Sequence, residues 1–144
     1  MEPTIYLFFN GTCLEAMTHY AETLGGDIVY VFRNGDAPDA DSRMPGGDDL
    51  VMNMMVKLGA TTVMASDSPD SMYSTPQGFR VQIAPPSLAE FERIFAVLAK
   101  DARSVEMPPG ETFWADRFAM VTDRFGTPWM LNHTGAKCPD PTAS

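Results

Sequence analysis

The fold of this chain is set by residues 4–33, which read TIYLFFNGTCLEAMTHYAETLGGDIVYVFR. The β-branched and aromatic run 4–9 predicts a short buried strand. Apolar residues of the following helix recur at steps of three and four, at Leu14, Met17, Ala21 and Leu24. Gly25 ends that helix, and residues 27–33 predict a second strand. Residues 4–33 are therefore expected to form a strand-helix-strand unit.

The same order begins again in the second half of the chain. Residues 79–84 (FRVQIA) predict a strand, and Ser87 with Glu90 forms a capping box for a second helix. The apolar face of this helix is expected at Leu88, Phe91, Phe95 and Leu98. A shift of 74 residues, from Leu14 to Leu88, superposes it on the first. Further strands are expected at 50–58 and 61–66, and at 103–107, 117–122 and 128–132.

The chain is thus predicted to be α+β, with two βαβββ modules in tandem. We expect one domain over residues 1–133, with module one at about 4–66 and module two at about 78–132. The Gly-, Pro- and Asp-rich segment 34–49 is expected to be an exposed loop. The polar residues 134–144 are expected to be a disordered tail.

Composition excludes several classes of protein. The 144 residues carry a net charge of −9, which argues against a nucleic-acid or anionic-membrane partner. No apolar run is long enough to span a bilayer, and the N-terminus does not resemble a signal peptide. Two cysteines, Cys13 and Cys138, cannot form a disulfide framework, which favours a reduced, cytoplasmic protein.

Three stretches of the sequence carry a family resemblance. They are residues 6–30, the MASDSP segment at 64–69, and ETFWADRFAMVTDRFGTPWMLN at 111–132. Together they resemble the PhnB-like branch of the vicinal oxygen chelate superfamily, which also holds glyoxalase I, extradiol dioxygenases and bleomycin and fosfomycin resistance proteins. The resemblance implies modules that curl into a glyoxalase-like cup, and a homodimer. It leaves open whether the modules pair within one chain or between two.

Metal-dependent relatives are implied to place ligands on the first and last strands of each module. In this chain those positions hold Ile5 or Tyr6, then Met64, Arg80 and Met130. Arginine stays protonated and methionine prefers soft ions, so this set does not suit Zn²⁺, Mg²⁺, Mn²⁺ or Fe²⁺. We therefore predict no metal at the usual positions and no cofactor. His19 and His133 have no ligand partner at metal-binding spacing.

Other side chains are candidates for a ligand site in the cup. Arg80 and Gln82 alternate with apolar residues and are expected to face it, where Arg80 either binds a carboxylate or phosphate or forms a salt bridge with Asp67 or Glu111. Tyr6 and Phe8, their partners by the 74-residue shift, would give an aromatic wall. The predicted ligand-binding residues are Tyr6, Phe8, Met64, Arg80, Gln82, Trp114 and Met130.

One catalytic candidate stands out. Glu111 would act as a general base if apolar neighbours raised its pKa, and would otherwise be a cap or a loop carboxylate. Trp114 would stack on a ligand, close the cup or lie in a dimer seam.

These observations favour a protein that binds a small organic ligand in a β-cup without the usual metal ligands, with no reaction assigned. The alternatives are a drug-sequestering protein of the resistance type, for which the acidic charge would attract a cationic drug, and a metal-dependent enzyme of the glyoxalase or dioxygenase type with ligands elsewhere. The expected partners are a second copy of the chain and a small molecule.

Overall fold

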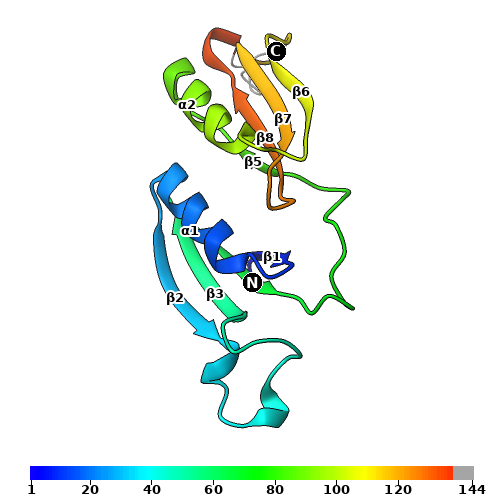
Figure 1. Cartoon of the computed structure of the whole chain (residues 1–144). Coiled ribbons are helices and arrows are strands. Elements are labelled where there is room, and N and C mark those ends of the chain that lie inside the picture. The colour runs from blue at the N-terminus through cyan, green and yellow to red at the C-terminus, as the bar shows by residue number, and fades with distance from the viewer. Residues whose placement is uncertain (138–144) are drawn as a thin grey trace. The chain divides into compact units, whose positions relative to one another are not determined.

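The computed structural model describes residues 1–137, which form two compact units (Figure 1). The first unit is Met1–Ser74 and the second begins at Thr75. Each unit contains four strands and one α-helix. The predicted α+β class and the tandem arrangement of two modules are therefore confirmed.

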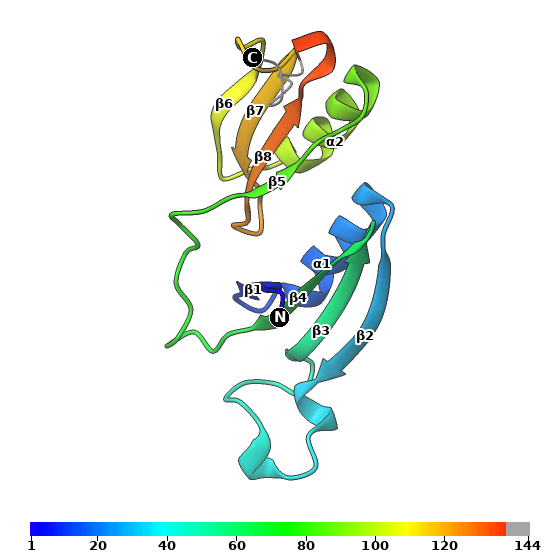
Figure 2. The same ribbon diagram turned by 180° about the vertical axis from the view of Figure 1, so that it is seen from behind.

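The first unit is a four-stranded sheet with a helix against it. Its elements are β1 (Ile5–Phe9), α1 (Cys13–Leu24), β2 (Asp27–Arg33), β3 (Val51–Leu58) and β4 (Thr61–Asp67). The strands lie in the order β1-β4-β3-β2, with β1 and β4 parallel and the other neighbours antiparallel (Figure 2). Helix α1 packs against β2, β3 and β4.

The second unit repeats this topology. Its elements are β5 (Val81–Ile83), α2 (Leu88–Ala99), β6 (Ser104–Gly110), β7 (Arg117–Thr122) and β8 (Pro128–His133). The strand order β5-β8-β7-β6 again pairs the first and last strands in parallel. In both units the helix connects the first strand to the second, and these two strands lie at opposite edges of the sheet. Such a crossover is why the strand-helix-strand order recurs in the sequence.

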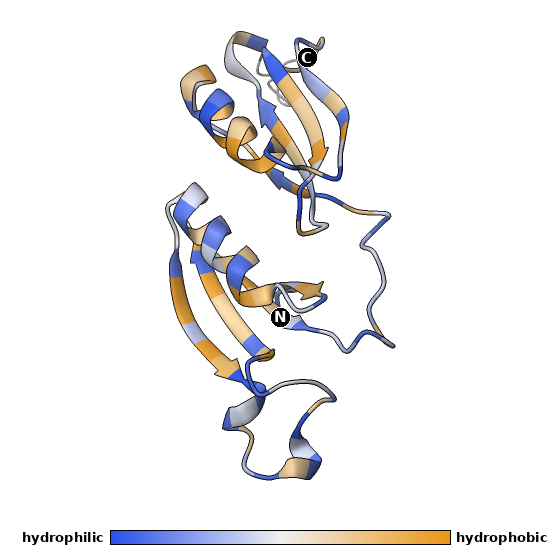
Figure 3. Ribbon diagram, viewed as in Figure 1, coloured by the Kyte–Doolittle hydropathy of each residue, from blue (hydrophilic) through white to orange (hydrophobic). Residues whose placement is uncertain are grey.

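Two of the predicted helix-end signals are confirmed, one at the end of α1 and one at the start of α2. Gly25 ends α1 at φ +70°, and its backbone N–H bonds to the Ala21 carbonyl. Ser87 caps α2, because its Oγ accepts the Glu90 backbone N–H at 3.1 Å. Figure 3 shows hydrophobic and hydrophilic residues mixed on both helices, as expected for helices that cover one face of a sheet.

The predicted helix faces are only partly correct. Met17 and Ala21 are buried as expected in α1, but the stripe is completed by Cys13, Ala16 and Tyr20. In α2 the buried residues are Phe91, Ile94 and Leu98, whereas Leu88 is 43% exposed. Leu88 is the first residue of its helix, and the buried stripe begins one turn later. The spacing of apolar residues by three and four positions therefore predicts which face of each helix is buried, but not where the buried stripe begins and ends.

The segment between β2 and β3 is more ordered than an exposed loop rich in glycine and aspartate suggests. It holds two 3-10 turns, η1 (Asn34–Asp36) and η2 (Ala40–Ser42). Asn34 is buried, donates through Nδ2 to the carbonyls of Met44 and Gly47, and accepts the Met44 N–H. The buried Asn34 amide thus joins η1 to residues that follow η2, a role that composition does not reveal.

The C-terminal segment is described only as far as Lys137. Gly135–Lys137, at the start of the segment expected to be a disordered tail, form a third 3-10 turn, η3. Residues 138–144, with Cys138 among them, lie outside the described part of the chain. Within residues 1–137, no helix is long and apolar enough to cross a membrane.

Candidate functional site

Each sheet has one face under its helix and one open face, and the candidate residues lie mainly on the open faces. In β1, Leu7 and Phe9 are buried, while Tyr6 and Phe8, which alternate with them, are 36% and 53% exposed. In β5, Val81 is buried and the neighbouring Gln82 is exposed. Strand alternation therefore places these aromatic and polar side chains opposite the helices, as the sequence predicted.

The open face of the first unit is an apolar surface with a small polar centre. Tyr6 pairs in register with Met64, and Met64 with Met55, which in turn faces Tyr30. The Asn53 amide joins the two phenols, because its Nδ2 donates to Tyr6 Oη at 3.0 Å and its Oδ1 accepts from Tyr30. The predicted Tyr6 and Met64 thus lie side by side, and Asn53 and Tyr30 are additions that the sequence did not single out.

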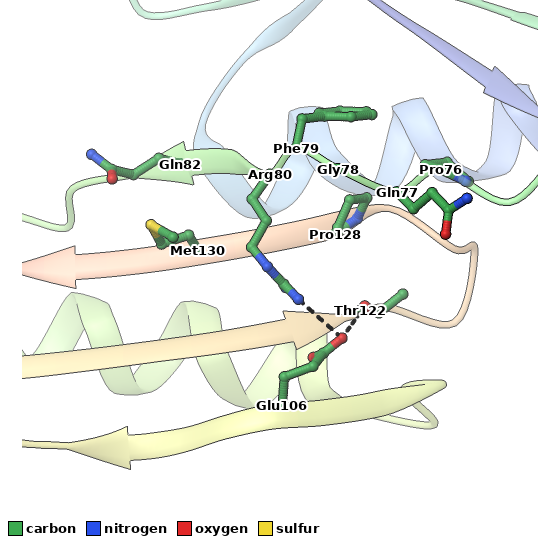
Figure 4. Close-up of a pocket in the computed structure, with 10 residues that line it drawn as sticks. All are labelled: Pro76, Gln77, Gly78, Phe79, Arg80, Gln82, Glu106, Thr122, Pro128 and Met130. Carbon is green, nitrogen blue, oxygen red and sulfur yellow. Dashed lines mark hydrogen bonds and ion pairs between the residues drawn. The ribbon is translucent and has the colours of Figure 1, made fainter.

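The open face of the second unit contains a concave pocket of about 570 Å³ (Figure 4). Three predicted ligand-binding residues, Arg80, Gln82 and Met130, line it, and Gln82 and Met130 are register partners. The structure adds residues that the sequence did not identify: Pro76, Gln77, Gly78, Phe79, Glu106, Thr122 and Pro128. Polar and apolar groups thus share one concave surface, as in many small-molecule sites.

Arg80 forms a salt bridge, but not with either of the expected partners. Its Nη2 lies 3.3 Å from Glu106 Oε1, and its Nη1 donates to the Trp129 carbonyl at 3.1 Å. Arg80 precedes β5 at one edge of the sheet, whereas Glu106 lies on β6 at the other edge. Figure 4 shows the guanidinium extending past Pro128 toward that carboxylate.

The two expected partners are engaged elsewhere. Asp67 is buried and accepts the backbone N–H groups of Cys13 and Val51, both at 2.9 Å. Glu111 pairs with Lys137 in the turn η3. The expectation that Asp67 or Glu111 would pair with Arg80 is therefore wrong, because neither carboxylate is available to it.

One carboxylate oxygen of Glu106 accepts contacts from three side chains. Ser104 Oγ donates to its Oε1 at 3.0 Å, and Thr122 and Arg80 contact the same atom. Partial burial tends to raise the pKa of this carboxyl, but the bonds from Thr122, Ser104 and Arg80 outweigh burial, and the net pKa is lowered. Glu106 is therefore a stable carboxylate facing a stable guanidinium, so the pair contributes no net charge to the pocket.

Glu111 does not have the apolar surroundings that a general base would require. Its side chain is 69% exposed, and its partner Lys137 also donates to the Thr112 carbonyl at 2.8 Å. The structure thus favours the alternative of a paired loop carboxylate. Among residues 1–137, the side chain paired with Glu111 is Lys137, and the role of Glu111 as a general base stays a prediction.

Trp114 lies in an aromatic cluster rather than in the pocket. Its ring centroid is 4.8 Å from that of Phe113 and 5.3 Å from that of Phe118, both in edge-on contacts. Phe113 is 88% exposed and Phe118 is buried. Trp114 therefore covers Phe118 and presents an exposed aromatic neighbour, which suits either a ligand or a protein contact.

The structure shows which side chains occupy the four positions that the family resemblance implies for metal ligands. Tyr6, rather than Ile5, shares the open face with Met64, and Met130 lies in the pocket with Arg80. None of these four side chains is a ligand suited to a hard divalent ion. His133 Nδ1 is bonded to the Pro85 carbonyl at 2.9 Å. Within residues 1–137, no three His, Cys, Asp or Glu side chains are grouped so as to hold a metal ion.

The Asp-x-Phe-Gly-x-x-Trp stretch at residues 123–129 has a structural explanation. Asp123 is buried, and its Oδ1 accepts the backbone N–H groups of Phe125 and Thr127 at 2.9 and 3.0 Å. Its Oδ2 accepts the Trp129 indole N–H at 2.9 Å. The motif therefore fixes the turn between β7 and β8, the strands that carry Thr122 and Met130 into the pocket.

Comparison with known proteins agrees with this architecture. The family description "Glyoxalase/Bleomycin resistance protein/Dioxygenase superfamily" matches residues 6–131. Protein YjdN of Escherichia coli K12 is 34% identical over 135 residues, which cover 88% of this chain and 91% of that protein.

Two solved structures extend the comparison. Protein PA1353 from Pseudomonas aeruginosa superposes with a TM-score of 0.80 at 38% identity, over 92% of this chain and 97% of that one. The PhnB protein from Bacillus cereus superposes with a TM-score of 0.79 at 24% identity, over 92% and 99% of the two chains, and supports the fold alone. With a family match over residues 6–131 and relatives of this similarity, the chain belongs to the Glyoxalase/Bleomycin resistance protein/Dioxygenase superfamily.

Proposed function

We propose that this protein binds a small organic molecule in the pocket on the open face of its second unit, without a divalent metal at the usual superfamily positions. The observation that carries the proposal is the pocket itself, in which Arg80, Glu106 and Gln82 stand beside the apolar Phe79 and Met130. Polar groups that orient a ligand and apolar groups that bury it therefore share one concave surface. No reaction is assigned to the site.

The chemistry of the side chains supports metal-independent binding. A hard divalent ion needs oxygen or nitrogen donors that converge at about 2 Å. At the positions that correspond to the superfamily's metal ligands, Arg80 would bring a positive charge and Met130 a thioether in the second unit, and Met64 would bring a thioether in the first. These side chains therefore do not fit the metal that the superfamily implies.

We also propose that the protein works as a homodimer in the cytoplasm. The support is the exposure of large apolar side chains on the open face of the first unit, where Phe8 and Phe32 are 53% and 42% exposed. Exposed aromatic side chains on one face of a sheet commonly mark a protein contact. Light scattering at micromolar concentration should give twice the chain mass, and a strictly monomeric protein would refute the dimer.

A fragment screen by ligand-observed NMR tests the binding proposal. Hits should compete for one site and should perturb the backbone amides of Gln82, Thr122 and Met130. Gln82→Trp would fill the pocket from an exposed position and should abolish binding. Ala96→Trp is the matched control, because Ala96 is exposed on α2 and should leave binding unchanged.

Two outcomes would contradict the proposal. Binding that survives Gln82→Trp would place the ligand outside this pocket. Calorimetric titration with Mn²⁺, Ni²⁺ or Zn²⁺ should show no tight site of one ion per chain, and a clear one would refute metal-independent binding. Tight, salt-sensitive binding of a cationic glycopeptide drug would instead favour the sequestering alternative.

A further inference from the structure

The pocket in the second unit contains one fixed positive and one fixed negative group. The side chains of Arg80 and Glu106 are only 22% and 29% exposed. They meet above the sheet between its two edge strands, and Thr122 bonds to the same carboxylate oxygen (Figure 4). A ligand that enters this pocket therefore meets two charged groups whose charges already neutralise each other.

This pairing limits the charge that a ligand can carry. A carboxylate or phosphate would gain from Arg80 only if it displaced Glu106 or lay against it, and like charges in a partly buried site repel. A cation would meet the same difficulty with Arg80. A single charge of either sign is thus opposed by one member of the pair, whereas an uncharged polar group is opposed by neither.

Both members of the pair still have hydrogen-bonding capacity. Arg80 uses Nη1 and Nη2 in its contacts with the Trp129 carbonyl and Glu106, and it has five N–H donors in all. Glu106 collects its three side-chain donors on Oε1, and its Oε2 pairs with no other side chain among residues 1–137. Gln82, exposed at the pocket, adds an amide with one donor side and one acceptor side.

Apolar groups lie beside these polar atoms. Phe79 is 48% exposed, and Pro128 and Met130 line the same pocket. Methionine adapts its shape and makes favourable contacts with aromatic rings. The pocket therefore offers an apolar wall next to a paired donor and acceptor.

We infer that the pocket selects uncharged small molecules in which a carboxamide-like group, with a donor and an acceptor together, is attached to a flat apolar body. The carbonyl oxygen would accept from Arg80 or Gln82, and the N–H would donate to Glu106. This inference rests on the proposed function and specifies its ligand class. It also departs from the simpler expectation that an inward arginine marks a site for an anion.

Benzamide, benzoate and benzamidine test it, because they share one shape and carry a charge of zero, minus one and plus one at neutral pH. Dissociation constants measured by NMR titration of the full chain should rank benzamide tightest for the wild type. Glu106→Gln leaves Arg80 unpaired, so benzoate should gain about fivefold relative to benzamide. Arg80→Gln should shift preference toward benzamidine by a similar factor. Circular dichroism verifies that each variant is folded.

The wild-type ranking decides the matter even if a variant fails to fold. Benzoate or benzamidine binding more tightly than benzamide would overturn the inference and leave the proposed function standing. If none of the three perturbs the amides around the pocket at millimolar concentration, both the inference and the proposed function are overturned. Benzamide first, with the two opposite shifts in the variants, supports both.

Discussion

Substitution of Asp123 by asparagine should destabilise the protein far more than its small change in shape suggests. Asp123 is 2% exposed, and it accepts the N–H groups of Phe125, Thr127 and Trp129. All three neighbours are donors, whereas an asparagine side chain has one acceptor oxygen and one donor nitrogen. Whichever way the amide is turned, its NH₂ group faces a donor.

The magnitude follows from these three bonds. If the amide oxygen replaces Oδ1, the bonds from Phe125 and Thr127 persist but lose their charge assistance, which roughly halves their strength. The bond from the Trp129 indole is lost, and the indole N–H then faces the NH₂ group of the asparagine, so that two donors oppose each other. With about 1.5–3 kcal/mol for each bond to a charged acceptor, one lost bond and two halved bonds should together lower the free energy of unfolding by about 3–6 kcal/mol in Asp123→Asn.

Urea unfolding followed by near-ultraviolet circular dichroism and tryptophan fluorescence measures this change. Asp116→Asn is the matched control, because Asp116 accepts one backbone N–H, from Ala136 at 3.0 Å, in an exposed position. We expect the control to cost less than about 1 kcal/mol. Equal effects of the two substitutions, or a cost below about 1 kcal/mol at Asp123, would refute the assignment of the motif to turn formation.

Three further predictions concern other contacts. The pKa of Glu106 is lowered in the folded state. Its stabilising contribution is therefore present above its unfolded pKa of about 4.3 and is lost as the pH falls through the folded value. Acid unfolding curves of wild type and Glu106→Gln should converge at low pH. Burial, with the Asp67 charge, raises the pKa of the Cys13 thiol, so in a Cys138→Ser background DTNB at pH 8 should react only after unfolding. Ser87→Ala should cost about 1 kcal/mol in urea unfolding, through loss of the α2 cap; no change would contradict it.

Periodicity and caps were sufficient to predict the architecture. Strand 27–33 is predicted at the bounds that β2 has in the structure, and Ser87 caps α2 as expected, although the Glu90 side chain pairs with Arg93. These signals are local, because alternation and helix caps depend on residues a few positions apart. The repeat followed from the same signals, since each unit reuses one order of elements.

The sequence predicts only those site residues whose orientation follows from the alternation of side chains along a strand. That rule put Arg80 and Gln82 on the open face, where they line the pocket. The partner of Arg80 could not be predicted, because Glu106 lies on the opposite edge strand and only the three-dimensional sheet brings the two together. The acidic position within the predicted strand 103–107 was the one available signal. Asp67 was misassigned because its backbone bonds are invisible in sequence.

The central claim is that an organic molecule, and not a divalent metal, occupies the pocket beside Met130. A ¹³C-methyl spectrum of the methionines tests it most directly, with benzamide or Mn²⁺ added in turn and with Met72, 76% exposed, as a reporter of non-specific effects. Benzamide should shift the Met130 methyl saturably and leave Met72 unmoved. One equivalent of Mn²⁺ should broaden Met64 and Met130 no more than Met72. Selective broadening of Met64 and Met130 by Mn²⁺, with Met130 unmoved by benzamide, would contradict the claim.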